Sequence, residues 1–428
     1  MYIRKKYLNK LISKKRNGMV KIITGIRRCG KSVLLFNLFY DHLLEEGVSD
    51  ENIIKIKLDE RINIKLRNPN TLCEYVKEYI YSKKEKFYLF IDEIQMIEYI
   101  NVEGVNSKIG IYEVLNELNS YENLDVYVTE SNSKMLSSDI ATEFRGRGDV
   151  VMVHPLSYEE FFEAYKGDKQ NAWNQYTMFG GMPYLLNLTS EEEKSEYLKR
   201  LLEKVYISDV IERNGVKKDS LVLGEILDIL ASSVGSLTSP TKLSNTYKSK
   251  TKQNISTNTI FRYINYFEDS FLIRKARRFE INGKGYIDSP AKYYFEDIGL
   301  RNARLDFKEQ DLTHIMESVI YNELIIRGFN VDIGIIEHFY NNAEGKRERT
   351  FLEIDFICNK GFNRFYIQSA YAIPDAEKRN QEIRGFKKIH DSYQKIVVVR
   401  EDIIPWRDEN GILYIGIEKF LLDSSLVN

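Results

Sequence analysis

The stretch KIITGIRRCGKSVLLF, from Lys21 to Phe36, decides which fold the sequence encodes. Val20–Ile23 is a short run typical of a β-strand, and an apolar segment typical of a helix follows Ser32. Between them, GIRRCGKS fits the pattern G-x-x-x-x-G-K-[ST], which requires a strand before it and a helix after it. The stretch therefore predicts a loop whose backbone N–H groups surround a phosphate.

Each part of this loop has an expected task. The glycines let the backbone wrap a phosphate, Lys31 reaches the β- and γ-phosphates, and the Ser32 hydroxyl binds Mg²⁺. The predicted cofactors are therefore ATP and Mg²⁺. The residues expected to contact the nucleotide are Gly25, Ile26, Arg27, Arg28, Cys29, Gly30, Lys31, Ser32 and Val33.

A second motif lies about 60 residues further on, where a P-loop protein needs a strand that ends in an acid. The hydrophobic run FYLFIDEIQ ends in such a pair, Asp92 and Glu93. Asp92 is expected to help hold Mg²⁺, and Glu93 to polarise the attacking water. The alternative, a glycine-rich turn with an unrelated acidic pair, is disfavoured because both motifs have the context they require.

Two further catalytic candidates follow the strand LDVYVTE. Asn132 is the predicted sensor of the γ-phosphate, with Thr129 and Ser131 close by. Arg147, in the RGR sequence, is predicted to supply a guanidinium to the transition state, in cis or from a neighbouring subunit. A solvated basic turn is the alternative interpretation of RGR.

Composition limits the class of protein. With 428 residues, 43% of them hydrophobic, the chain is long enough for several cored domains, and its net charge of −1 gives no overall attraction to nucleic acid. Three cysteines far apart favour a reduced, cytoplasmic setting over a disulfide framework or a zinc cluster. No signal peptide or long apolar span is apparent, so no membrane partner is expected.

The order of apolar runs predicts four regions. Strands alternating with helices indicate a parallel α/β sheet, the P-loop NTPase core, over 1–155. A helical lid is expected over 156–220, and a winged helix-turn-helix, bent at INGKGY, over 221–310. A mixed α/β domain is expected over 311–428.

Several motifs together resemble one family. KIITGIRRCGKS, YLFIDEIQ, SNSKMLSSDIATEFRGR, PLSYEEF and FGGMPY resemble the AAA+-like prokaryotic ATPases related to the archaeal ATPase group. KYYFEDIGLRNA and EIDFI…FYIQSAY resemble their C-terminal domain of unknown function. The resemblance implies an ATPase core, a helical lid, a winged-helix region and a nuclease-like terminal domain with a restriction-endonuclease-like fold.

One position departs from that family. Glu130 stands in TESNS where the family has glycine, which adds bulk and negative charge near the expected γ-phosphate. If the side chain faces the site, repulsion between its carboxylate and the γ-phosphate is worth several kcal/mol. The alternative is that the side chain turns away into solvent.

The terminal domain carries an incomplete nuclease motif. Restriction-type sites place an acid on a helix, an aspartate at a strand end, and (E/Q)-x-K on the next strand. Glu317, Asp355 and Gln368 fit the first three positions, but Ala370 stands where the lysine is needed. A scaffold without nuclease activity is therefore favoured over a working nuclease.

The winged-helix region is the predicted contact with double-stranded DNA, through phosphate contacts and a groove-inserted helix. Tyr263, Tyr266 and Phe267 have helical spacing and are expected in the core. A protein-docking winged helix is the alternative. The basic residues expected to face DNA are Lys242, Lys248, Lys250, Lys252, Arg262, Arg274, Lys275, Arg277, Arg278 and Lys284.

Two functions remain open from sequence. The first is an ATPase that acts as a nucleotide-driven switch or motor on DNA, as a monomer or a homo-oligomer. The second is an ATP-gated sensor that docks proteins, hydrolyses little and carries an inactive nuclease-like domain. The intact Asp92–Glu93 pair favours the first, and Glu130 favours the second.

Overall fold

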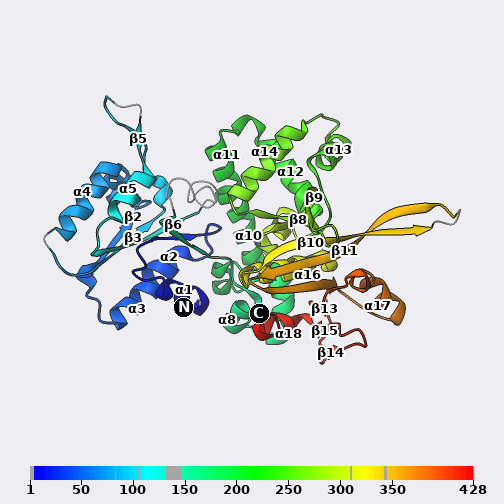
Figure 1. Cartoon of the computed structure of the whole chain (residues 1–428). Coiled ribbons are helices and arrows are strands. Elements are labelled where there is room, and N and C mark those ends of the chain that lie inside the picture. Colours follow the sequence, from blue (N-terminus) through cyan, green and yellow to red (C-terminus); the bar gives the residue numbers. More distant parts are fainter. Residues whose placement is uncertain are drawn as a thin grey trace. The chain divides into compact units, whose positions relative to one another are not determined.

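The computed structural model describes residues 4–81, 83–104, 107–131, 146–308, 311–341 and 345–427. The chain divides into two compact units. The first is Met1–Pro155 with the short stretch Asp269–Phe271, and the second is Leu156–Glu268 with Leu272–Asn428. Each unit has its own sheet, drawn from blue to cyan in the first and from green to red in the second (Figure 1).

A parallel sheet forms the centre of the first unit. Within the described residues its strand order is β2-β3-β6-β1-β7, and every neighbouring pair is parallel. Burial of every residue of β1, β3 and β6 confirms the predicted sheet covered on both faces. The strands are β1 Val20–Thr24, β2 Ile53–Lys57, β3 Phe87–Asp92, β6 Leu124–Glu130 and β7 Gly148–Met152.

Helices cover both faces of this sheet. On one face, α4 (Pro69–Ile80) and α5 (Ile111–Leu118) pack apolar side chains against β2, β3 and β6. On the other, the helix after the P-loop places Phe39 within 5.8 Å of Phe90 and 4.8 Å of Tyr127, measured between ring centroids. The remaining elements are α1 Lys5–Ser13, α2 Lys31–Val33, the π-helical turn Leu34–Phe39, α3 Tyr40–Glu45, β4 Ile100–Asn101 and β5 Lys108–Ile109.

The second unit begins with helices held together by polar side chains. The end of α9 is fixed by Asn302, whose Nδ2 donates to the carbonyls of Thr177 and Met178 at 2.9 Å. Asp297 accepts the Gly181 N–H at 2.7 Å, so FGGMPY is a turn tied to the segment before α15. The first helices are α8 Tyr158–Ala164, α9 Ala172–Phe179, α10 Glu191–Leu201 and α11 Ser208–Asn214, while α15 Ile298–Arg304 comes later in the chain.

Three helices and a hairpin follow in the order expected for a winged helix: α12 (Ser220–Ser232), α13 (Pro240–Thr251), α14 (Thr257–Asp269), then β8 (Ile273–Glu280) and β9 (Gly285–Phe295). In α14, Tyr263 and Phe267 are buried as expected, while Tyr266 is half-buried.

The hairpin also belongs to a larger sheet, which the sequence did not indicate. Among the described residues the order is β14-β15-β13-β12-β11-β10-β8-β9, with β8 parallel to β10. The predicted division at 310/311 therefore cuts through one continuous sheet. The remaining elements are β10 Asn330–Asn341, β11 Arg347–Lys360, β12 Asn363–Ala370, β13 Gln394–Val399, β14 Trp406–Arg407, β15 Leu413–Gly416, α16 Leu312–Ile326, α17 Ala376–Glu382 and α18 Ile417–Leu422.

Candidate nucleotide-binding site

The P-loop joins the carboxyl end of β1 to the start of α2. Gly25 has φ +141°, and a Cβ there would lie 2.0 Å from the Val153 carbonyl oxygen, so only glycine fits. Gly30, with φ +101°, precedes the first helical residue, Lys31. The loop therefore has the backbone conformation that its glycines predict.

Lys31 lies inside the loop. Its ammonium donates to the carbonyl oxygens of Gly25 at 2.9 Å and Ile26 at 3.0 Å, and only 5% of the residue is exposed. A lysine whose charge is held by loop carbonyls is placed to exchange them for phosphate oxygens, which are better partners because they are anionic.

The two predicted metal ligands meet. Ser32 Oγ donates to Asp92 Oδ1 at 3.0 Å, and Thr129 Oγ1 donates to the same oxygen. Burial raises the pKa of Asp92 above its usual value, although these two hydrogen bonds oppose the shift. One hydroxyl and one carboxylate fit Mg²⁺, which usually takes few protein oxygens and completes its shell with water and phosphate.

Glu93 is held beside this pair by an unusual backbone. Its φ of 54° and ψ of 52° are left-handed, which is uncommon for a residue other than glycine. Its N–H donates to Thr129 Oγ1 at 3.0 Å. Its carboxylate accepts hydrogen bonds from Gln95 Nε2 and, at 3.3 Å, from Ser131 Oγ. Such strain is often retained at functional sites, and here it fixes the predicted base next to Asp92.

Two predicted catalytic residues are not placed at this edge. Asn132 lies outside the described residues. The Arg147 carbonyl accepts the Val20 N–H at 2.8 Å, at the first residue of β1, whereas the P-loop follows its last residue. The two ends of β1 are about 13 Å apart at roughly 3.3 Å per residue. The predicted cis role of Arg147 is therefore wrong, and a role from a neighbouring subunit stays a prediction.

Glu130 ends β6, opposite Thr24 of β1. Only 3% of the residue is exposed, so the alternative of a side chain turned into solvent is wrong. A buried carboxyl group therefore follows Thr129 directly.

Sequence reasoning missed Arg4. This buried residue, just before α1, donates from Nη1 to the Cys29 carbonyl at 2.9 Å and the His154 carbonyl at 2.8 Å. Nη2 donates to the Pro155 carbonyl at 3.3 Å. The Cys29 thiol also donates to the Val153 carbonyl at 3.3 Å. The N-terminal arginine thus joins the P-loop to the segment after β7, and nothing set it apart from the other cations of MYIRKKYLNK.

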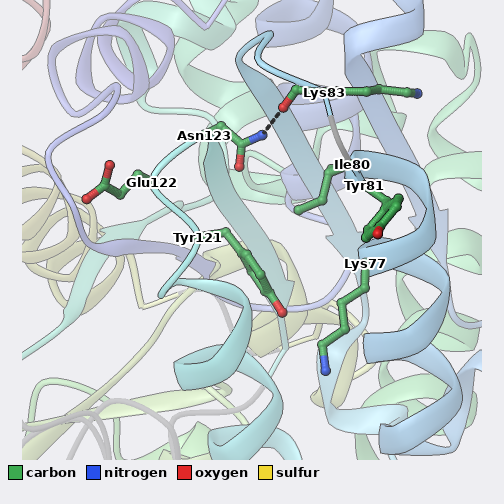
Figure 2. A pocket seen from close by; sticks show the side chains of 7 residues that line it. All are labelled: Lys77, Ile80, Tyr81, Lys83, Tyr121, Glu122 and Asn123. Atoms are coloured by element: carbon green, nitrogen blue, oxygen red, sulfur yellow. Dashed lines mark hydrogen bonds between the residues drawn. The ribbon is translucent and has the colours of Figure 1, made fainter.

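The hollow in Figure 2, about 520 Å³, lies elsewhere. It is formed by the last turns of α4 and the segments before β3 and β6, including Lys77, Tyr81 and Tyr121. Asn123 Nδ2 donates to the Lys83 carbonyl at its edge. Because β3 and β6 are parallel to β1, their starts lie at the edge opposite the P-loop. This hollow is therefore distinct from the phosphate site.

A basic surface lies on the helices of the second unit. Lys242, Lys248, Lys250 and Lys252 are exposed, and α14 exposes Arg262 beside Phe261, which is 53% exposed.

Two predicted basic residues of the wing bind their own chain. Arg274 forms an ion pair with Glu296 at 3.1 Å, and Arg278 donates to the carbonyls of Pro290 and Ser289. The prediction that Arg274 and Arg278 face DNA is therefore not supported, whereas Lys284 is exposed at the hairpin turn.

Within the described part of the chain, none of the helices has both the length and the apolarity that a membrane span requires. The strand–loop–helix with Lys31, Ser32 and Asp92 defines a P-loop nucleotide-binding protein.

Comparisons with known proteins give the family. A model described as AAA domain matches residues 17–162, and one described as Domain of unknown function (DUF8612) matches residues 170–311. An uncharacterized protein of Haemophilus influenzae is 32% identical over 403 residues, 93% of each chain. The chain belongs to the same family, whose N-terminal part is an ATP-binding domain of the AAA type.

Two more distant proteins are also similar to this chain. Uncharacterized protein MJ1544 of Methanocaldococcus jannaschii is 29% identical over 422 residues, covering 94% of this chain and 84% of that protein. The structure of the Walker-type ATPase paby2304 of Pyrococcus abyssi aligns with 71% of this chain and 96% of its own, at 16% identity and a TM-score of 0.48.

Proposed function

We propose that this chain is a Mg²⁺-dependent ATPase that acts as a nucleotide-driven switch on double-stranded DNA. The observation that carries the proposal is the linked set of Ser32, Asp92, Thr129 and Glu93 at the carboxyl edge of the first sheet. Passive phosphate binding needs the loop and the lysine, whereas hydrolysis also needs a carboxylate that is held ready to activate water.

Each residue of this set has one task. Lys31 leaves the carbonyls of Gly25 and Ile26 and binds the β- and γ-phosphates, while the loop N–H groups bind the remaining oxygens. Ser32 and Asp92 would hold Mg²⁺, which neutralises phosphate charge when bound. Glu93, held by Gln95 and Ser131, orients a water and accepts its proton.

Replacing Lys31 and Glu93 one at a time should separate the binding of ATP from its hydrolysis. Lys31→Ala should weaken Mg·ATP binding about 10- to 100-fold, since a hydrogen bond to a charged group is worth about 1.5–3 kcal/mol. Glu93→Gln should bind Mg·ATP as the parent does but lose about 100-fold or more in turnover. Calorimetry and phosphate release measure the two quantities, with exposed Lys10→Ala as the control. No heat of Mg·ATP binding to the parent would refute the proposal.

The DNA part of the proposal rests on the basic surface of α13 and α14. Exposed Lys248, Lys250 and Lys252 suit phosphate contacts, and Arg262 on α14 suits contact with a base edge. Salt dependence tests it, because each phosphate contact contributes about 0.9 to the slope of log K against log[salt].

The variant Lys248→Ala/Lys250→Ala/Lys252→Ala should lower that slope by about 2–3 for a fluorescent duplex. The matched control, Lys83→Ala/Lys84→Ala/Lys86→Ala, removes the same charge from an exposed segment of the first unit and should leave the slope unchanged. Equal slopes for both triple variants would remove α13 as the DNA contact.

A second candidate function is an ATP-gated sensor with little hydrolysis. Burial of Glu130 at the end of β6 favours it, since a negative charge close to the γ-phosphate would repel the charge that develops there. DNA-stimulated turnover that is lost in Lys31→Ala supports the switch, and Mg·ATP binding without turnover supports the sensor.

A further inference from the structure

The incomplete nuclease motif of the C-terminal sheet has a lysine after all, from a place the sequence did not indicate. Glu317 on α16 and Asp355 on β11 are buried, as is Lys292 on β9. Strand β9 belongs to the hairpin after α14 and lies outside the helix and strands that carry the predicted motif.

Lys292 lies among three carboxylates. Its Nζ is 2.9 Å from Glu317 Oε1, 2.8 Å from Glu353 Oε1 and 3.8 Å from Asp355 Oδ1. The Tyr294 hydroxyl also donates to Glu317 Oε1, and the Ser369 N–H donates to Asp355 Oδ2 at 2.8 Å. Glu317 and Asp355, the acids with which a restriction-type site would bind Mg²⁺, therefore already have donors from the chain.

A divalent cation does not fit this arrangement. It would need the oxygens of Glu317 and Asp355 that face the ammonium, and would meet a like charge in a buried place. Consistent with this, no three or more His, Cys, Asp or Glu side chains are arranged to hold a metal ion in the part of the chain that the structure describes.

The ammonium itself is stable there. Burial would lower the pKa of Lys292, but attraction by Glu317, Asp355 and Glu353 outweighs burial and raises the pKa above its usual value.

We propose that Lys292 is the resident cation of this site: it pairs with Glu317 and Glu353, lies beside Asp355 in place of a metal ion, and leaves the sheet a scaffold that does not cleave DNA. The same contacts tie the hairpin after α14 to β11 and α16. This inference stands independently of the ATPase proposal, because it concerns a different sheet and needs no nucleotide.

The test measures Mn²⁺ binding to the full chain by electron paramagnetic resonance, in the absence of nucleotide. Lys292→Met removes the charge at similar length and should gain one Mn²⁺ site, at least about tenfold tighter than any in the parent. Lys292→Arg should gain none, and Lys292→Met/Asp355→Asn should lose the gain. A folded Lys292→Met protein with unchanged Mn²⁺ binding would overturn the proposal.

Comparing Mn²⁺ binding by the parent and by Asp355→Asn is a second test, which can be done even if Lys292→Met does not fold. Equal Mn²⁺ binding by these two proteins supports the proposal, whereas weaker binding by Asp355→Asn contradicts it. Supercoiled DNA that is incubated with the parent protein and Mn²⁺ should stay intact. Cleavage that is lost on both Lys292→Met and Asp355→Asn would instead make Lys292 the catalytic lysine of a working nuclease.

Discussion

Replacing Gly25 by alanine tests the P-loop geometry most directly. An alanine Cβ would lie 2.0 Å from the Val153 carbonyl oxygen and 3.0 Å from its carbon, so β1 or the segment after β7 must move. Holding a residue other than glycine at φ +141° costs about 1–3 kcal/mol, and forced displacement in a packed interior costs about another 1–3. The free energy of unfolding of the first unit should therefore fall by about 2–6 kcal/mol.

A matched control separates the clash from the strain. Gly18 also has positive φ, +75°, but a Cβ there meets nothing within 4 Å. Gly18→Ala should therefore lose only about 1–2 kcal/mol, the cost of the left-handed conformation.

Urea unfolding of both variants measures these losses, and calorimetry with Mg·ATP measures the effect on the loop. Gly25→Ala should bind Mg·ATP more weakly, because its amides no longer surround the phosphate, while Gly18→Ala should bind as the parent does. If both variants lose the same stability and keep the parent's affinity, the close approach of Gly25 to Val153 does not exist in the folded protein.

Three further predictions concern buried polar groups. Arg4→Ala removes three carbonyl contacts and should lower the stability of the first unit by about 2–4 kcal/mol in urea and weaken ATP binding, while exposed Lys5→Ala should do neither. Burial raises the pKa of Asp297 to about 7, although its backbone hydrogen bonds oppose the shift. Between pH about 4 and pH about 7 the folded state therefore keeps a proton on Asp297 that the unfolded state has lost. The free energy of unfolding of the second unit should therefore fall as the pH rises from 4 to 7. An equally large fall in Asp297→Asn would contradict this. Glu130→Gly should hydrolyse ATP faster than the parent, tenfold for each 1.4 kcal/mol of repulsion removed, and equal rates would show that the buried carboxyl group is harmless.

The nucleotide site could be predicted from sequence because its parts are local. A strand, a glycine-rich loop and a helix adjoin in the chain, and a hydrophobic strand carries its acids at its own end. Parallel pairing then brings the two ends together, so Ser32 meets Asp92 as predicted. The same reasoning failed for Arg147, since being near a strand in sequence does not say at which end of the sheet a residue lies.

The sequence alone determined the P-loop fold and that Ser32 and Asp92, the predicted metal ligands, meet at one edge of its sheet, because these depend on periodicity and short motifs. Only the tertiary structure decided that Arg4 holds the loop, that one sheet unites the wing hairpin with the terminal domain, and that Lys292 faces Glu317 and Asp355. Each of these contacts joins residues at least 25 positions apart. Their meeting depends on which strands pair and how helices pack over them, which no local pattern encodes.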